Sequence, residues 1–298
     1  MIIDFAVRPP YKGFLSLVPS FEWEHLPPPK FPRAASPWKD DCEQSPSKVH
    51  GSMEMFIAEM DEAGIAQAVV NHEGGRSNPE LSHTFAVPND EIAELGELYP
   101  ERFHLLAGIN LDDVKSGVSE VERVVGNLGF QGISVAAGWH DPPLYMDDEQ
   151  FYPIYEKCQE LGGILQLTIS IFMGPDLSYI DPIRLQHIAS TFPNLPIVVS
   201  HGGWPNVMQI IGIAVRYSNI WLAPDFYTFK EGVPGGELYV EAANYCLEDR
   251  LLFSSVYPSR PLKKSVEQFS RLPFREDVLE KALYNNAQWL LEERNKSG

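Results

Sequence analysis

A histidine that follows a short apolar run is the strongest chemical signal in this sequence. His201 comes directly after Pro196–Ser200 in the stretch PIVVSHGGWP, and Gly202 and Gly203 follow it. The β-branched residues before it predict a buried strand, and the two glycines permit close backbone approach. A histidine in that place can be a metal ligand, a general acid or base, or a structural core residue. The choice depends on which other residues meet it.

Other polar side chains fall at the ends of similar runs elsewhere in the chain. Each also has a structural interpretation: Asp4 can pin the first strand, Arg8 and His72 can be loop residues, and Asp225 can cap a helix. Carboxylates and imidazoles together supply general acid and base chemistry, and an arginine fork recognises carboxylates. The catalytic candidates are His201, Asp225 and Asp4, and the substrate-binding candidates are Arg8, His72, Thr168, Tyr257 and Arg260.

Short β-rich runs alternate with amphipathic stretches along the whole chain, and this alternation predicts a parallel sheet. Eight such units in 298 residues favour an α/β fold of the closed (β/α)8 TIM-barrel type, as one domain over residues 1–298. No G-x-G-x-x-G follows a strand, which argues against a dinucleotide-binding fold. In a barrel the site forms at the carboxyl ends of the strands, where the candidates lie. The expected strands are 2–7, 67–72, 103–110, 130–137, 163–170, 196–201, 219–224 and 250–255.

One region interrupts this alternation. Residues 9–50 are proline-rich, aromatic and without clear periodicity. A long irregular segment inside a compact domain is usually functional or disordered, and six aromatic side chains argue against a disordered linker. We therefore expect an insertion after the first strand that serves as a lid over the catalytic face or as a subunit-contact arm.

The composition excludes several classes of protein. The formal net charge is −18, which argues against nucleic acid or an anionic membrane as a partner, because both select clustered Lys and Arg. The three cysteines are far apart and form no C-x-x-C pair, so no disulfide framework or thiolate zinc site is indicated. The start MIIDFAVRPP lacks the apolar core of a signal peptide, and no apolar run approaches a membrane span. We expect a cytoplasmic protein with a small-molecule substrate.

Four segments resemble the amidohydrolase-related family, the branch of the amidohydrolase superfamily that includes aminocarboxymuconate-semialdehyde decarboxylase. The opening MIIDFAVRPP is similar to that family's I-D-x-H-x-H start, and PIVVSHGGWP to its strand-six histidine motif. RLLFSSVYPSRP resembles its G-S-D-Y-P segment, and DVLEKALYNNAQWLL its closing helix. The resemblance covers nearly the whole chain and implies a TIM barrel. It also implies, by family habit, a homo-oligomer.

The resemblance also implies a metal site from which this chain departs. Where the family has ligand histidines on its first strand, Ala6 and Arg8 stand here; Thr168 and Val256 stand where the family has a fifth-strand histidine and an eighth-strand aspartate. Of that pattern only His201 remains. A zinc site needs about three protein ligands, so we expect no metal and no other cofactor, with Arg8 partly replacing the ion by a fixed positive charge.

These residues lead to one favoured function and two alternatives. The favoured one is a metal-independent hydrolase or carboxy-lyase acting on a small carboxylated substrate. Arg8 would bind the carboxylate, His201 would move a proton, and Asp225 or Asp4 would orient the imidazole or activate water. Lactone or ester hydrolysis and decarboxylation remain open. The first alternative is a zinc or manganese enzyme with rerouted ligands, drawn from Asp4, His72, His201 and Asp225. The second is a non-catalytic ligand-binding barrel.

Overall fold

The computed structural model describes residues 1–16, 44–72 and 87–293, and the side chains of all of these but the last. Most of the segment expected as an insertion over 9–50 lies outside these ranges. Its described ends are a 3-10 turn over Lys12–Ser16 and helix α1 over Pro46–His50. The expected lid or contact arm therefore stays a prediction.

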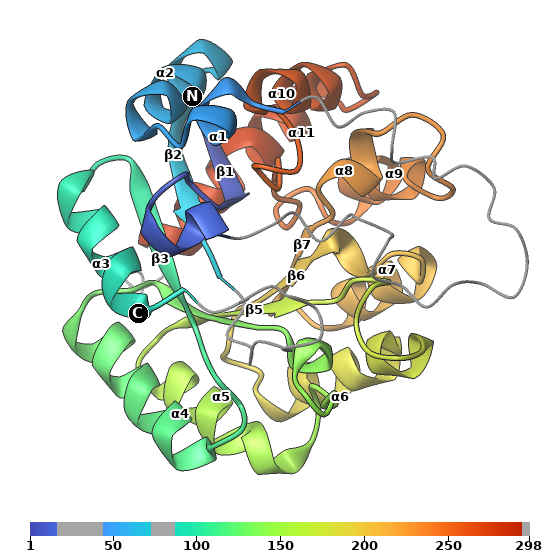
Figure 1. Ribbon diagram of the computed structural model, residues 1–298. Coiled ribbons are helices and arrows are strands. Elements are labelled where there is room, and N and C mark those ends of the chain that lie inside the picture. Colours follow the sequence, from blue (N-terminus) through green and yellow to red (C-terminus); the bar gives the residue numbers. More distant parts are fainter. Residues whose placement is uncertain (17–43, 73–86, 294–298) are drawn as a thin grey trace, which may run out of the picture.

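Parallel strands form the centre of the molecule (Figure 1). They are hydrogen-bonded in chain order, which is the arrangement of a (β/α)8 barrel. The predicted fold class is thus confirmed, and seven of the eight predicted runs overlap a strand. The strands are β1 Ile2–Val7, β2 Ile65–Val70, β3 Phe103–Gly108, β4 Gly132–Val135, β5 Ile164–Thr168, β6 Ile197–Ser200 and β7 Ile220–Ala223.

The eighth predicted strand, 250–255, is not a regular strand. On the β7 side, Leu222 donates to the Arg250 carbonyl at 2.9 Å, and Leu252 donates back to Leu222 at 2.9 Å. On the β1 side, the backbone N–H of Phe5 donates to Phe253 at 2.9 Å. The segment closes the ring through isolated bridges, between Leu222 and Leu251 on one side and between Val7 and Tyr257 on the other, and not through a continuous ladder.

Helices surround the strands, and their ends follow ordinary capping rules. In α2, the Ser52 hydroxyl accepts the Met55 N–H at 3.2 Å, and Gly64 closes the helix with φ of 74°. No helix in the described ranges is long and apolar enough to cross a bilayer. After α1 and α2 Met53–Ala63, the helices are α3 Asn89–Leu98, α4 Val114–Val121, α5 Tyr152–Glu160, α6 Pro182–Thr191, α7 Val207–Arg216, α8 Phe226–Phe229, α9 Glu237–Tyr245, α10 Leu262–Ser270, α11 Glu276–Glu280 and α12 Asn286–Gln288.

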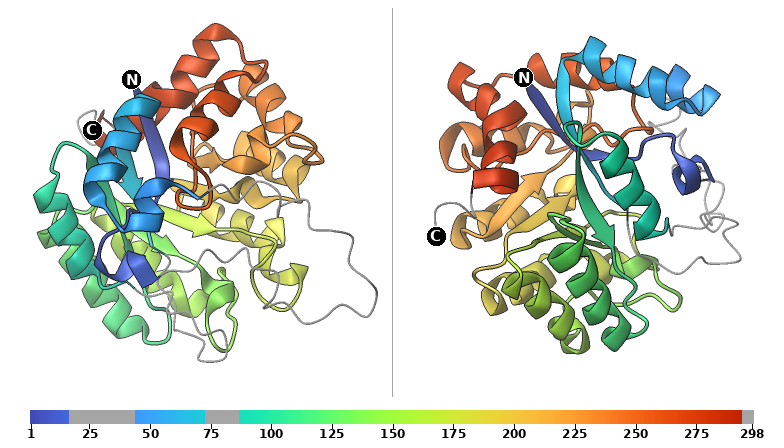
Figure 2. Two further views of the ribbon diagram at one scale, coloured as in Figure 1. Left: turned by 45° about the horizontal axis from the view of Figure 1, so that its top comes forward. Right: turned by 90° about the vertical axis from the view of Figure 1, so that its left-hand side faces the viewer.

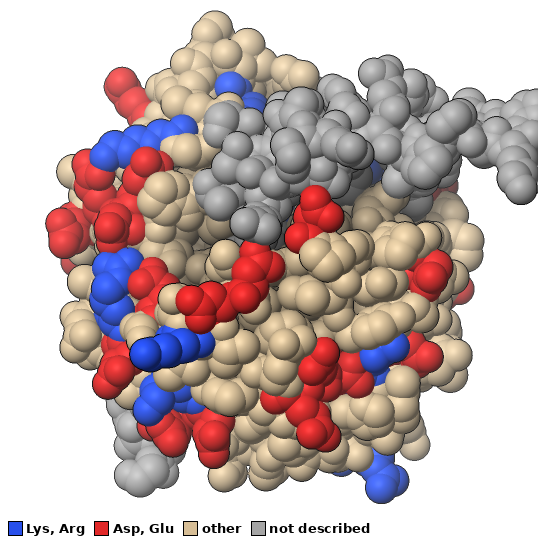
Figure 3. All heavy atoms as spheres, turned by 60° about the horizontal axis from the view of Figure 1, so that its bottom comes forward, with Lys and Arg blue, Asp and Glu red and all other residues tan. Residues whose placement is uncertain are grey.

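The two ends of the described chain share one apolar cluster. Ile3 and Phe5 of β1 pack in the same buried group as Leu290 and Leu291, which follow α12. Both views in Figure 2 show the C-terminal helices beside β1. A separate and larger apolar layer lies between the strands and the outer helices. On the face shown in Figure 3, acidic side chains are spread widely and several stand beside basic ones.

Candidate active site at the carboxyl ends of the strands

The predicted catalytic pair His201 and Asp225 meets at the ends of two neighbouring strands. His201 directly follows β6 and begins a 3-10 turn over His201–Gly203, whereas Asp225 lies two residues after β7. The imidazole Nδ1 is 2.6 Å from the carboxylate Oδ2, and both side chains are buried. The carboxylate therefore holds one ring nitrogen and leaves Nε2 as the nitrogen that can exchange a proton with a ligand.

The backbone at this pair is strained. His201 has φ of 60° and Asp225 has φ of 47°, and Val256, after the eighth segment, has φ of 56°. Such values are uncommon outside glycine, and for a β-branched valine they are an outlier. Strain of this kind costs about 1–3 kcal/mol per residue and persists where the surrounding structure fixes it. Three consecutive segments of the barrel carry it at their carboxyl ends, and that is where catalytic groups belong in this fold.

The glycines after His201 are required by close packing. A Cβ on Gly202 would lie 2.6 Å from the Pro224 side chain and 2.7 Å from the Tyr239 hydroxyl oxygen. A Cβ on Gly203 would lie 2.6 Å from the Ile210 side chain. Both glycines also have positive φ, so only glycine lets the chain turn sharply enough to present the imidazole toward Asp225.

Aromatic rings border the pair. The Tyr227 ring meets His201 edge-on at 6.2 Å between centroids, and Trp204 stacks on Tyr227 at 5.0 Å. Burial raises the pKa of Tyr227 well above its usual range, and the nearby Asp225 charge raises it further. The phenol therefore stays protonated at physiological pH. The aromatic rings of Tyr227 and Trp204 lower the local dielectric constant, which strengthens the electrostatic interactions inside the site.

Burial also governs the carboxylate of the pair. It raises the pKa of Asp225 above the usual value, while the His201 charge and a hydrogen bond to that imidazole lower it. The carboxylate is thus poised to stabilise an imidazolium beside it, which is the role of the acid in nucleophile–histidine–acid triads. The pair can donate and accept a proton in a largely dry setting.

Asp4, the third catalytic candidate, is fully buried but holds backbone. Its Oδ1 accepts the Ser255 N–H at 2.9 Å and the Ala6 N–H at 3.2 Å. Desolvation raises the pKa of Asp4 to about 6, and the charge on Asp225 contributes to the increase. The carboxyl group therefore ties β1 to the eighth segment. This agrees with the structural interpretation of Asp4, in which it pins the first strand.

Two of the substrate-binding candidates have structural partners. His72 is buried, and its Nε2 accepts the Val87 N–H at 3.0 Å. The Tyr257 hydroxyl lies 2.7 Å from the Ser47 hydroxyl of α1, and its ring packs on Phe56 of α2 at 4.6 Å. His72 Nε2 and the Tyr257 hydroxyl are thus engaged by a connection and by a helix, and this placement favours structural roles.

The other three candidates lie near the mouth of the barrel. Thr168 is the buried last residue of β5 and pairs in register with Ser200. Arg8 is half-buried, and its backbone N–H donates to Tyr257 at 2.9 Å. Arg260 is buried, with its guanidinium carbon 5.3 Å from the ring centroid of Phe226, the residue after Asp225. Arg260 is thus linked to the site through the ring of the residue that follows Asp225.

A polar line that the sequence analysis missed crosses the barrel just below the pair. The Asn71 amide donates to Gln166 at 2.7 Å, and the Gln166 amide donates to the Ser200 hydroxyl at 2.7 Å. Ser200 precedes His201 directly. The signal in the sequence was one glutamine inside the apolar run ILQLT, which is easily read as ordinary strand alternation. Buried amides of this kind fix the strand ends that carry the site.

Comparison with known proteins places the chain in a family. The amidohydrolase family profile matches residues 25–292, which is most of the chain. The chain belongs to the amidohydrolase family. A solved TIM-barrel protein of uncharacterized function from Bordetella bronchiseptica is 31% identical to this amidohydrolase, with a TM-score of 0.83 over 97% of this chain and 98% of the other.

Relatives with assigned activities are more distant. Gamma-resorcylate decarboxylase from Polaromonas sp. is 24% identical over 277 residues, covering 77% of this amidohydrolase and 84% of the relative. A solved dihydroxybenzoic acid decarboxylase from Polaromonas sp., with bound manganese and the inhibitor 2-nitroresorcinol, has a TM-score of 0.66 at 19% identity. It covers 98% of this chain and 97% of its own. These relatives agree in fold with the barrel described above.

The side chains of this amidohydrolase do not fit a transition-metal site within the described ranges. No three His, Cys, Asp or Glu side chains there lie close enough together to hold an ion. The rerouted set that the sequence left open is therefore not assembled: His201 and Asp225 face each other, while His72 accepts a backbone N–H. Ala6 and Val256 carry no donor atoms at all.

Proposed function

We propose that this amidohydrolase-family protein is a carboxy-lyase for a small carboxylated substrate, with His201 as the proton donor. The observation that carries the proposal is the 2.6 Å contact between His201 Nδ1 and Asp225 Oδ2 at the ends of β6 and β7. Support for decarboxylation over hydrolysis comes from the relatives, because the Polaromonas enzyme is named as a decarboxylase.

The chemical step needs one proton and no redox partner. The His201 imidazolium gives the proton on Nε2 to the carbon that bears the carboxylate. The bond between that carbon and the carboxyl carbon then breaks, its electron pair returns to the substrate carbon skeleton, and CO2 leaves. The buried Asp225 carboxylate stabilises the imidazolium before transfer and keeps the neutral ring in one tautomer after it. Water returns the proton to His201 for the next turnover.

The arginines supply anion recognition in this proposal. An arginine paired with the leaving carboxylate would stabilise the ground state and oppose the loss of neutral CO2. Arg8 and Arg260 therefore act best on an anionic or hydroxyl group that stays on the substrate. Arg260 is buried and lies over the ring of Phe226, the residue after Asp225, and this contact supports its role beside the acid–base pair. Thr168 contributes a hydroxyl at the end of β5.

The proposed step also proceeds without a resident metal. Its support is the donor set, since the places where the resemblance expects ligands hold Ala6, Arg8, Thr168 and Val256. A fixed guanidinium supplies positive charge without coordination, so binding of the anion does not require the ion. The loss of metal dependence is thus part of the proposal, and it is tested together with the activity.

The deciding experiment measures CO2 release and asks whether the carbon that loses CO2 takes up a proton from the solvent. The protein is incubated in D2O with dihydroxybenzoates and unsaturated dicarboxylates, with and without EDTA or added manganese. We expect CO2 release, one deuterium at the former carboxylated carbon, and equal rates with EDTA. A carboxylated lactone tested in parallel in 18O-labelled water would, if opened with one labelled oxygen while the other substrates release no CO2, show hydrolysis instead. Activity that appears only with manganese would remove the metal-independent part of the proposal.

Two variants test whether the activity depends on the His201–Asp225 pair. Asp225→Asn keeps the size of the side chain but removes the charge that stabilises the imidazolium, so kcat should fall by about 10²-fold or more. His50→Gln, at an exposed position in α1, is the matched histidine control and should retain full activity. Equal kcat in wild type and Asp225→Asn would take the pair out of the reaction.

A further inference from the structure

The interior of the barrel is polar directly below the His201–Asp225 pair. Side chains that face the inside of a (β/α)8 barrel form layers of about four, supplied by alternate strands, and bulky branched residues normally fill them. In this chain one such layer comes from β2, β4, β6 and the eighth segment, and its side chains are buried and polar. The members of this polar layer are Asn71, which directly follows β2, and Ser134, Ser200 and Ser254.

The alternation along each strand shows that the polar layer faces inward. Three of its members come two residues after a residue of the inner apolar cluster, which includes Val69, Val198 and Leu252. Ser134 lies between Ile133 and Val135, which pack in the outer apolar layer, so its side chain points to the inside. The polar layer therefore rests on the inner apolar cluster.

Two acceptors in the polar layer are unpaired. The Asn71 amide donates to Gln166 at 2.7 Å, and the Gln166 amide donates to Ser200 at 2.7 Å, so this chain of bonds turns Asn71 Oδ1 away from Gln166. Asn71 Oδ1 and the Ser134 hydroxyl are both buried, and neither has a hydrogen-bond partner in the parts of the chain that the structure describes. Buried polar atoms in native proteins are nearly always paired, so these two atoms call for a ligand group or a water.

A glycine stands between the two unpaired acceptors. β3 lies between β2 and β4, and Gly108 at its end is paired in register with Ser134. Leu106, two residues earlier, belongs to the inner apolar cluster, so a side chain at position 108 would point inward. Gly108 is partly exposed. The wall of the barrel over β3 thus carries no side chain at this level, with Asn71 on one side and Ser134 on the other.

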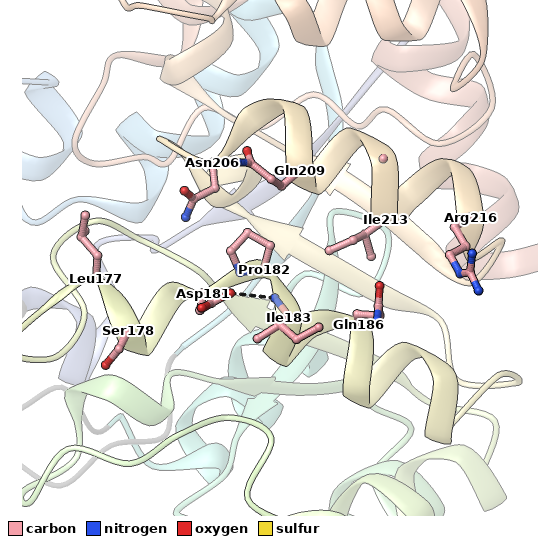
Figure 4. Close-up of a pocket in the computed structure, with 11 residues that line it drawn as sticks. Leu177, Ser178, Asp181, Pro182, Ile183, Gln186, Asn206, Gln209, Ile213 and Arg216 are labelled. Carbon is pink, nitrogen blue, oxygen red and sulfur yellow. Dashed lines mark hydrogen bonds between the residues drawn. The ribbon is translucent and has the colours of Figure 1, made fainter.

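The groove on the outer surface between α6 and α7 is a different kind of place (Figure 4). It has a volume of about 710 Å³ and is lined by residues of the two helices and of the 3-10 turn before α6. None of the buried unpaired side-chain atoms of the described ranges belongs to its lining. The barrel interior, and not this groove, therefore holds the polar atoms that call for a partner.

We propose that Asn71 and Ser134 bind a hydroxyl group of the substrate over Gly108 and thereby select hydroxylated carboxylates. This inference rests on the proposed function, because it takes the carboxylated substrate to enter the barrel mouth where His201 acts. The substrate hydroxyl donates to Asn71 Oδ1 and forms a second hydrogen bond with the Ser134 hydroxyl, which is both a donor and an acceptor. A site with buried polar groups rejects an analogue that lacks the matching group, because the analogue leaves them unpaired.

Calorimetric titration of the full chain measures this selection without any need for turnover. The probes are two pairs of carboxylates that differ by one hydroxyl, salicylate with benzoate and malate with succinate. In wild type, the hydroxylated member of at least one pair should bind about tenfold more tightly or better. Ser134→Ala and Asn71→Leu should remove most of that preference.

Ser265→Ala is the matched control. Ser265 is a buried serine of α10 whose hydroxyl donates to the Pro261 carbonyl at 2.9 Å, so this variant should keep the full preference. Far-UV circular dichroism checks that each variant is folded, and if Asn71→Leu does not fold, Ser134→Ala decides alone. Wild type without a hydroxyl preference in either pair would overturn the proposal, and so would a preference that Ser134→Ala leaves intact.

The failure of this proposal is distinguishable from failure of the proposed function. A hydroxyl preference that depends on Ser134, in a protein that releases no CO2, would keep the subsite and remove the carboxy-lyase. CO2 release at equal rates in wild type, Ser134→Ala and Asn71→Leu would keep the carboxy-lyase and remove the subsite.

Thermal denaturation of the free protein is a second test. Ser134→Ala removes a buried hydroxyl that has no partner, so its Tm should equal or exceed that of wild type. Ser265→Ala removes a hydrogen-bonded hydroxyl and should lower Tm. A loss for Ser134→Ala as large as that for Ser265→Ala would mean that a structural water already satisfies the Ser134 hydroxyl, and it would overturn the subsite.

Discussion

The two halves of the barrel mouth contain the same residue types, but these residues contact different partners. On the β1–β2 side, Asp4 and His72 are buried, and one polar atom of each accepts backbone N–H groups. On the β6–β7 side, His201 and Asp225 are equally buried but contact each other. In both halves, an aspartate and a histidine come from neighbouring strands or the residues just after them.

This difference shows that residue type and strand-end position do not separate catalytic from structural groups. What separates them is the partner. A carboxylate that accepts two N–H groups fixes a backbone, whereas a carboxylate that holds an imidazole tunes a proton donor. The strained φ values of His201 and Asp225 point the same way, because such strain is concentrated at functional sites. Four substitutions test whether the two halves of the barrel mouth differ in this way.

The largest effect is expected for His201→Gln. Removing the proton donor should lower kcat by about 10²–10⁴-fold, because general acid catalysis contributes factors of that size. The melting temperature should fall as well, because the buried Asp225 carboxyl loses its imidazole partner, so kcat is compared per folded molecule. Steady-state kinetics and thermal denaturation check both halves of the expectation. An active His201→Gln variant would place the proton donor elsewhere in the molecule.

The next effect concerns Asp4 and pH. The pKa of this buried carboxyl is raised to about 6 from 3.8, so the folded protein binds its proton more tightly than the unfolded chain does. Stability is therefore highest when Asp4 is protonated and falls as the pH rises from about 4 through about 6, by about 3 kcal/mol for two pKa units. Asp4→Asn removes this term and keeps an oxygen for both N–H groups.

Denaturant titrations of wild type and Asp4→Asn at pH 4.5 and pH 7.5 test the sign. The charge on Asp225 is one cause of the raised pKa of Asp4, so the difference between the two proteins reports Asp4 together with its coupling to Asp225. Parallel pH profiles for the two proteins would mean that the Asp4 carboxyl has no raised pKa.

A smaller loss of stability is expected for His72→Phe. The substitution leaves the buried Val87 N–H without its acceptor, which costs about 1–3 kcal/mol. Activity per folded molecule should remain within a few fold of wild type. The reverse pattern, normal stability with activity lost as in His201→Gln, would move His72 into the site and erase the contrast between the two halves.

The smallest effect is expected for Tyr257→Phe. Its hydroxyl contacts Ser47, which keeps its other partner Glu59, so the loss should be about 1 kcal/mol. The KM for any substrate should not change, because the hydroxyl is directed to α1. A tenfold rise in KM at unchanged stability would restore the substrate-binding role expected from the sequence.

Periodicity predicted the fold well because it records burial. Seven runs correspond to strands, and the observed ends fall within two residues of the predicted ones, as in β4, where residues outside the strand continue the apolar pattern. The eighth run looked the same in the sequence. It closes the barrel only through isolated bridges to β1 and β7, and this depends on how distant parts of the chain meet it, which leaves no local signal in the sequence.

For the site, the sequence predicted the positions of the candidate residues better than it predicted their contact partners. His201 and Asp225 could be paired because neighbouring strands bring their ends together. The roles of His72 and Tyr257 could not be foreseen, since Val87 and Ser47 lie on segments whose position depends on the whole barrel. The left-handed backbone at Val256 was equally hidden, because valine gives no local hint of positive φ.

The cluster that joins Ile3 and Phe5 to Leu290 and Leu291 has a consequence for the order of folding. During synthesis the first strand leaves the ribosome long before its partners at the other end of the chain exist. The inner core can therefore close only after translation is almost finished, and until then β1 exposes an apolar edge. Contacts of such long sequence separation form slowly, and an exposed edge invites aggregation. Deleting the residues after α12 should therefore lower the yield of native protein even where equilibrium stability would tolerate the loss.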